Sequence, residues 1–271
     1  MRMLLVLIGA LTFSGALPAQ EANSIRGGWV ADVDGRTQVY LLIVRGAVVT
    51  GTHCFDCADP GNLGFIIDGR VDSAGVHFAI RHEYQAGKVT LDDARGVLKD
   101  RELILTLQPR SGAAHAQLLT LHRAVPLPTA QPPAPAPAGP ARPRAEYVAP
   151  GPAQPLSADK VLGLWLWGAG PGKQYFIIRR VGRQLLGMVC GPCDNPNAMA
   201  PLDGFAIDGT ALTFNIVHED TGSAAAHGPF NNVAHATLAR NELHLKVIPS
   251  YEPPDSTPFE MTLLGPVIWR P

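Results

Sequence analysis

The sequence predicts an all-β protein with two tandem eight-stranded antiparallel meander barrels joined by a Pro/Ala-rich linker. Three observations lead to this prediction. The chain repeats itself, each copy reads as short strands between turn residues, and proline and alanine dominate one long central segment. We expect the first barrel over residues 25–123, the linker over residues 124–159 and the second barrel over residues 160–268.

The repeat is defined by identical residues at a constant spacing of 136, as in Trp29 and Trp165 (165 − 29). The same spacing relates Gly27 to Gly163, Gln38 to Gln174, Gly51 to Gly187, Cys54 to Cys190, Cys57 to Cys193, His82 to His218 and Glu83 to Glu219. Within this register we expect a local slip, because Gly64-Phe65 matches Gly204-Phe205 and Asp68-Gly69 matches Asp208-Gly209. After Glu219 the second copy carries extra residues, and the match resumes with Glu102-Leu103 against Glu242-Leu243.

Residues 1–19 are typical of a secretory signal peptide. Arg2 supplies the positive start, and the apolar run from Met3 to Phe13 is too short to cross a bilayer. Ala16 and Ala19 are the candidates for the residue before the cleavage site. No later segment is long and apolar enough to be an integral membrane segment. We therefore expect a secreted or periplasmic protein, in a compartment where disulfides persist.

The charge balance argues against one class of partner, and the composition of the linker indicates a spacer. A net charge of -1 with 17% charged residues argues against a nucleic-acid partner, which usually requires a basic excess. The linker has too few large apolar side chains to bury a core, so it should form an extended, semi-rigid spacer.

Turn residues divide the first copy into eight predicted strands. These are Gly28–Val33, Gln38–Arg45, Val48–His53, Phe65–Val71, Val76–Tyr84, Val89–Val97, Glu102–Gln108 and Gln117–His122. Asp34-Gly35, Arg45-Gly46 and the segment Asp72–Gly75 are typical turn sequences. Short connections make neighbouring strands antiparallel, and a meander of eight such strands can close into a barrel without exposed edges.

Each copy opens with a Gly-x-Trp motif, Gly27-Gly28-Trp29 and Gly163-Leu164-Trp165. With the strand and glycine pattern that follows, the chain resembles secreted bacterial lipocalin-like proteins of the calycin group. This resemblance implies a barrel in which Trp29 and Trp165 plug the closed end. The Cys-x-x-Cys and His-Glu pairs are not part of the lipocalin pattern and need an explanation of their own.

Strand alternation predicts where the histidines point. Val76, Phe78, Ile80 and His82 share one face of their strand, which is apolar and should face the core. His82 should therefore point inward and Glu83 to the outer face or rim, and the same pattern applies to His218 and Glu219. Because alternate meander loops lie at the same end, His82 should share an end with the Cys54–Cys57 loop, and His218 with Cys190–Cys193.

Three interpretations of each cluster compete. Export favours a local disulfide, Cys54 with Cys57 and Cys190 with Cys193, beside a core histidine. Alternatively, the two sulfurs and the inward histidine could bind zinc, with Cys54, Cys57 and His82 in one copy and Cys190, Cys193 and His218 in the other. Thiol–disulfide exchange is disfavoured, because no amphipathic helix follows Cys190-Gly191-Pro192-Cys193 to lower a thiol pKa.

The sequence predicts a binding or interaction module rather than an enzyme, and it offers no catalytic residue. Each barrel would have an open end lined by the Cys loop and the inward histidine, where a small apolar ligand or a peptide could bind without a cofactor. The alternative is a zinc-dependent hydrolase or zinc-binding protein that uses the Cys–Cys–His cluster to activate water.

Overall fold

The computed structural model describes residues 24–57, 59–83, 88–110, 115–124, 152–218, 230–249 and 258–266. It contains two closed, eight-stranded antiparallel barrels in tandem, which confirms the predicted fold class. The predicted signal peptide and most of the linker lie outside the described residues. Among the described residues, no helix has the length and apolarity needed to span a membrane.

The first barrel is a meander in which each strand pairs with the next. Its strands are β1 (Gly27–Val33), β2 (Arg36–Arg45), β3 (Val48–Cys54), β4 (Leu63–Asp72), β5 (Gly75–Glu83), β6 (Val89–Lys99), β7 (Glu102–Pro109) and β8 (Gln117–Arg123). Pairing of β1 with β8 closes the barrel. A short 3-10 helix, η1 (Pro60–Asn62), connects the Cys loop to β4.

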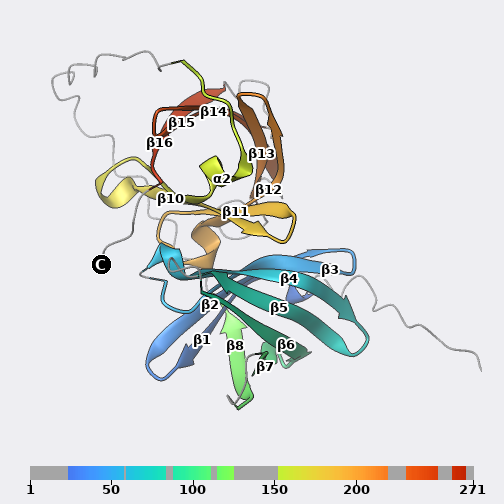
Figure 1. Cartoon of the computed structure of the whole chain (residues 1–271). Coiled ribbons are helices and arrows are strands. Elements are labelled where there is room, and N and C mark those ends of the chain that lie inside the picture. Colours follow the sequence, from blue (N-terminus) through green and yellow to red (C-terminus); the bar gives the residue numbers. More distant parts are fainter. Residues whose placement is uncertain are drawn as a thin grey trace, which may run out of the picture.

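The second barrel repeats this order. Its strands are β9 (Gly163–Trp167), β10 (Gln174–Val181), β11 (Gln184–Cys190), β12 (Met199–Asp208), β13 (Ala211–His218), β14 (Phe230–Ala239), β15 (Glu242–Ile248) and β16 (Phe259–Leu264). The 3-10 helices are η2 (Gly170–Gly172) and η3 (Pro196–Ala198), and the one short α-helix in this part of the described chain is α2 (Ala158–Val161). Figure 1 shows α2 within the ring of strands.

Each barrel buries a tryptophan of its first strand in its apolar core. Trp29 and Trp165 are fully buried, and their ring nitrogens donate to the backbone oxygens of Ile25 and Val161. In the first barrel the guanidinium of Arg123 lies 4.0 Å from the centre of the Trp29 ring. Arg123 also donates to the backbone oxygens of two residues before β1, so it holds the chain entry onto the barrel.

The predicted register slip between the two copies is wrong. Leu63 pairs with Cys54 and Met199 pairs with Cys190, so the spacing of 136 continues through the Cys loop and β4. The position of Asp68 corresponds to Gly204, and both have positive φ where the pairing shifts. Both copies thus use a left-handed residue at their bulge, a conformation that Asp and Gly adopt more readily than most other residues. The recurring Gly-Phe and Asp-Gly pairs are therefore coincidental.

The two barrels pack against each other through the outer face of their first four strands. Figure 1 shows β10 and β11 beside β2, β3 and β4. An apolar cluster, here called the interface cluster, fills this contact; it consists of Val39, Leu41, Cys54, Cys57, Leu63, Phe65, Leu164, Tyr175, Ile177, Met188, Cys190, Cys193 and Met199. Arg45 and Asp203 form an ion pair of 3.2 Å across the contact. The contacts are reciprocal, because η1 packs on β10 and η3 packs on β1 and β2.

Candidate functional site

The cysteines lie at disulfide distance within each copy. The Sγ–Sγ separation is 2.15 Å for Cys54 and Cys57 and 1.99 Å for Cys190 and Cys193. All four belong to the interface cluster and are buried between the barrels. Each Cys-x-x-Cys loop is therefore closed locally and held on its outer side by the other barrel.

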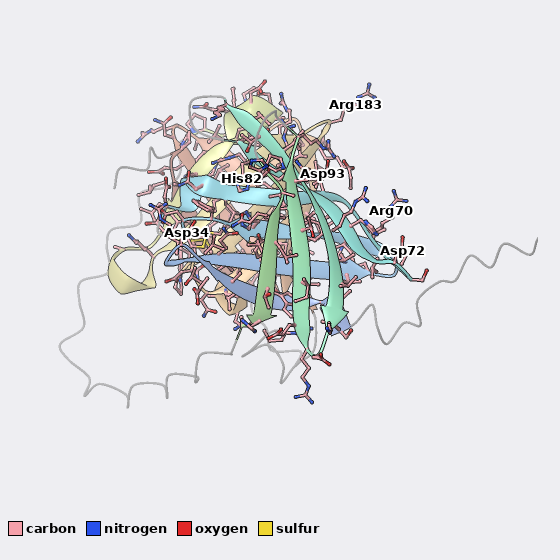
Figure 2. All side chains as sticks on the ribbon, turned by 90° about the horizontal axis from the view of Figure 1, so that it is seen from below. Asp34, Arg70, Asp72, His82, Asp93 and Arg183 are labelled. Carbon is pink, nitrogen blue, oxygen red and sulfur yellow. A yellow bond between two sulfur atoms is a disulfide. The ribbon has the colours of Figure 1, made fainter. Side chains whose placement is uncertain are left out.

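His82 points into the first barrel, as strand alternation predicts. It is 5% exposed, and Figure 2 shows it within the body of the molecule, whereas Arg70, Asp72 and Arg183 extend away from it. Cys54 belongs to the interface cluster on the outer face of the barrel, so the sheet separates its sulfur from the His82 imidazole. Among the described residues, no group of three His, Cys, Asp or Glu side chains could hold a metal ion.

Instead of sulfurs, His82 contacts a second histidine that the sequence analysis missed. The Nδ1 of His53 lies 3.1 Å from the Nε2 of His82, and the Nε2 of His53 lies 3.3 Å from the Oε1 of Gln38. The hydroxyl of Tyr40 donates to the same Gln38 oxygen at 3.0 Å. We call these four residues the histidine network. Their side chains are buried inside the barrel near the Cys loop.

The electrostatics of the histidine network favour neutral rings. Burial, and then the neighbouring His82, lower the pKa of His53 well below its ordinary value. Burial also lowers the pKa of His82, although Asp92 and a hydrogen bond to the Asn62 backbone oppose this effect. Two neutral imidazoles suit the 3.1 Å contact, because one ring nitrogen donates and the other accepts.

The second barrel has a pocket in the corresponding region. His53 pairs with Tyr40 across β2 and β3, and Val189 pairs with Phe176 at the same positions of β10 and β11. Valine and phenylalanine thus replace two polar members of the network. The resulting pocket has a volume of about 480 Å³. Its lining includes Gly191 and Pro192 of the Cys loop, so it lies at the end of the barrel that the sequence analysis singled out.

Four polar side chains line this pocket among mainly apolar neighbours. They are Gln174, Asn197, His218 and Asn232, and the Nδ2 of Asn232 lies 3.3 Å from the Nε2 of His218. Burial lowers the pKa of His218, which favours a neutral imidazole. The apolar lining is Trp167, Phe176, Val189, Met199, Ile216, Phe259 and Met261. A mostly apolar cavity with a few polar groups is the usual form of a small-molecule site.

One wall of the pocket is shared with the contact between the barrels. Met199 lines the pocket, and its sulfur also accepts a long hydrogen bond of 3.9 Å from the Thr52 hydroxyl of the first barrel. The ring of Pro196, at the start of η3, lies against Gly28. A Cβ on Gly28 would come within 2.8 Å of this ring. The first barrel therefore supports the segment that forms one side of the pocket.

No protein-family model, curated protein or solved structure matches this chain. The geometry of the two barrels is consequently the basis for any functional conclusion.

Three other predicted site residues, Trp29, Trp165 and Glu83, do not line the pocket. Trp29 and Trp165 belong to the apolar cores, and Glu83 pairs with Arg81 at 2.6 Å on the outer face of β5. Glu83 also interacts with Arg179 of the second barrel. Burial lowers the pKa of Arg179, and the negative charge of Glu83 opposes this effect. Glu219 lies outside the described residues.

Proposed function

We propose that the chain is an exported binding protein whose second barrel takes a small, mostly apolar molecule into the pocket beside His218. The first barrel is a filled copy that supports the pocket wall. The observation that carries this proposal is the difference between the copies. The same region holds the buried histidine network in one barrel and contains a pocket of about 480 Å³ in the other.

The size and lining of the pocket support a small-molecule ligand. Pockets for such ligands usually measure about 300–1,000 Å³ and are lined by apolar and aromatic side chains with a few polar groups. Eight-stranded barrels are either filled by side chains or hold one small ligand. The two copies in this chain represent these two cases on one backbone, so ligand binding requires only a change of side chains.

Two sequence features support an exported, lipocalin-like protein: the signal-peptide pattern of the N-terminal residues and the Gly-x-Trp that opens each copy. The cysteines of each Cys-x-x-Cys lie at disulfide distance, which suits a compartment where disulfides persist. In this proposal the two disulfides keep the Cys loops in place, and no cofactor is needed. The zinc alternative would require reduced cysteines and a histidine on the same face of the sheet as the sulfurs. Assays for zinc and free thiols on the purified protein distinguish the two proposals.

A fluorescence titration with Nile red, an uncharged dye that brightens in apolar surroundings, tests the binding function. Val189→Trp should fill the pocket and weaken dye binding by at least about tenfold, which corresponds to about 1.4 kcal/mol. Val189→His, which introduces the residue of the first barrel at this position, should weaken it as well. Val48→Trp is the matched control, because Val48 is 56% exposed on the first barrel.

The control variant should bind the dye as the wild type does. Circular dichroism of each variant verifies that the barrels have folded. If both Val189 variants bind Nile red with wild-type affinity, the dye does not occupy this pocket and the proposed function is wrong.

A further inference from the structure

The described lining of the pocket in the second barrel carries no Asp, Glu, Lys or Arg side chain. Its one ionisable side chain is His218, and burial favours the neutral ring by lowering the His218 pKa. A charged ligand group placed against this described lining would have no opposite charge to pair with, which is strongly unfavourable.

Three amide side chains line the pocket, those of Gln174, Asn197 and Asn232, and each has a carbonyl oxygen and an NH₂ group. Asn232 is 8% exposed, so its amide is nearly removed from water. A ligand group with one donor and one acceptor, such as a carboxamide, a lactam or a urea, matches these amides better than a group that only accepts or only donates.

The first barrel carries a different group at the position of Asn232. Asp92 pairs with Ile80 and Asn232 pairs with Ile216, and these isoleucines are equivalent in the repeat. The filled barrel therefore has a carboxyl group beside its histidine, whereas the barrel with the pocket has the uncharged amide of nearly the same shape. This exchange places an amide beside the pocket histidine where the first barrel has a carboxyl group.

We propose that the pocket binds an uncharged molecule that combines an apolar body with an amide-like head group. This inference rests on the proposed binding function and adds the charge and the chemistry of the ligand. The head group would lie beside Asn232 and Gln174, and the apolar body against Phe176, Ile216 and Met261.

Three probes with the same alkyl chain test the inference: decanamide, decanoate and decylammonium, each measured by calorimetry and by displacement of Nile red at pH 7.5. We expect decanamide to bind at least about tenfold more tightly than either charged probe, because burying an unpaired charge costs more than the 1.4 kcal/mol that a factor of ten represents. Decanoate or decylammonium binding as tightly as decanamide would overturn the inference. If Nile red binds and decanamide does not, the inference fails and the proposed function stands; if Nile red does not bind, the proposed function itself fails.

A charge substitution provides the second arm. Asn232→Asp gives the pocket the acidic group found in the first barrel and should shift the preference towards decylammonium by about tenfold. Asn241→Asp is the matched control, because Asn241 is exposed in the turn between β14 and β15 and the net charge changes equally. An unchanged preference in Asn232→Asp would show that this amide does not face the ligand head group and would also overturn the inference.

Discussion

Replacing His53 by valine, the residue at the same position of the second barrel, should make the protein less sensitive to acid. His53 is 4% exposed and its ring nitrogen lies 3.1 Å from that of His82. Burial, together with repulsion from a protonated His82, lowers the pKa of His53 well below 6.5. The folded barrel therefore holds His53 in its neutral form over a pH range in which the unfolded chain already takes up a proton.

The sign and size of the effect follow from this difference. The stability that neutral His53 contributes is fully present above about pH 6.5, the ordinary pKa of histidine. It decreases as the pH falls below this value. A histidine that stays neutral in the folded state costs about 1.4 kcal/mol per pH unit in this range. His82 also has a lowered pKa, so it adds to the slope in the same direction. His53→Val should remove the His53 part of the slope, about 1.4 kcal/mol per pH unit, and leave the part of His82.

Urea unfolding between pH 7.5 and pH 5, followed by circular dichroism, measures the slope. Asp92 and Tyr40 face the histidine pair in both proteins, so the comparison largely cancels their contributions. His115→Val is the control; that ring is exposed, and the variant should retain the wild-type slope. Equal slopes for His53→Val and the wild type would refute the argument that His53 is held neutral by burial.

Three further predictions concern the framework around the pocket. Arg123→Ala removes the contact with the Trp29 ring and the hydrogen bonds to the chain before β1. It should lower the free energy of unfolding, measured by urea titration, by about 1–2 kcal/mol. An unchanged free energy of unfolding would mean that Arg123 does not hold this segment. Ile177→Asp places a charge in the interface cluster, where Ile177 is fully buried, and should cost about 3 kcal/mol or more, whereas a neutral effect would show that the barrels separate readily. Peptide mapping without reductant should recover Cys54 linked to Cys57 and Cys190 linked to Cys193, and a crosslink between the barrels would contradict the structure.

The fold could be predicted because its determinants are local. Turn sequences such as Asp34-Gly35 separate strands with alternating apolar residues, and the predicted strands agree with the structure to within about two residues. The inward direction of His82 followed from the same alternation. Short connections then leave an antiparallel meander as the simplest arrangement.

The contact between the barrels was not predicted, although one signal for it exists. In β2 the residues from Val39 to Val44 form a continuous apolar run, so both faces of the strand are buried. Continuous runs of this kind indicate strands covered on both sides, whereas a barrel alone needs only one apolar face. The partner of the outer face comes from the other repeat, which no local pattern in the first repeat identifies.

The pocket could not be predicted because it depends on the sum of side-chain volumes. His53 follows the alternation of Val49 and Gly51 on β3, so its inward direction was available from the sequence. Whether the interior is then filled depends on which side chains meet from several strands. Exchanging His53 for Val189 and Tyr40 for Phe176 accompanies the change from a filled barrel to one with a pocket.

Gly64 explains how the first barrel accommodates two histidines, and it provides a final prediction. A Cβ at Gly64 would lie 2.6 Å from the Cε1 of His82, closer than atoms can approach, so the His82 ring lies directly against the β4 backbone. The equivalent residue of the second barrel is Ala200, which pairs with Val189 rather than with a histidine. In the second barrel Ala200 replaces the smaller Gly64, and on the neighbouring strand Val189 replaces the larger His53.

This relation predicts that Gly64 and His53 are energetically coupled. Gly64→Ala alone should cost about 1–3 kcal/mol, because the His82 ring is forced into the space that His53 occupies. Combined with His53→Val the cost should be smaller than the sum of the two single effects, by about 0.5–3 kcal/mol, because valine leaves room for the ring to move. A double-mutant cycle in urea at pH 7.5 measures this coupling. Strictly additive effects would mean that His82 relaxes in another direction, and that the alanine and valine of the second barrel are independent of each other.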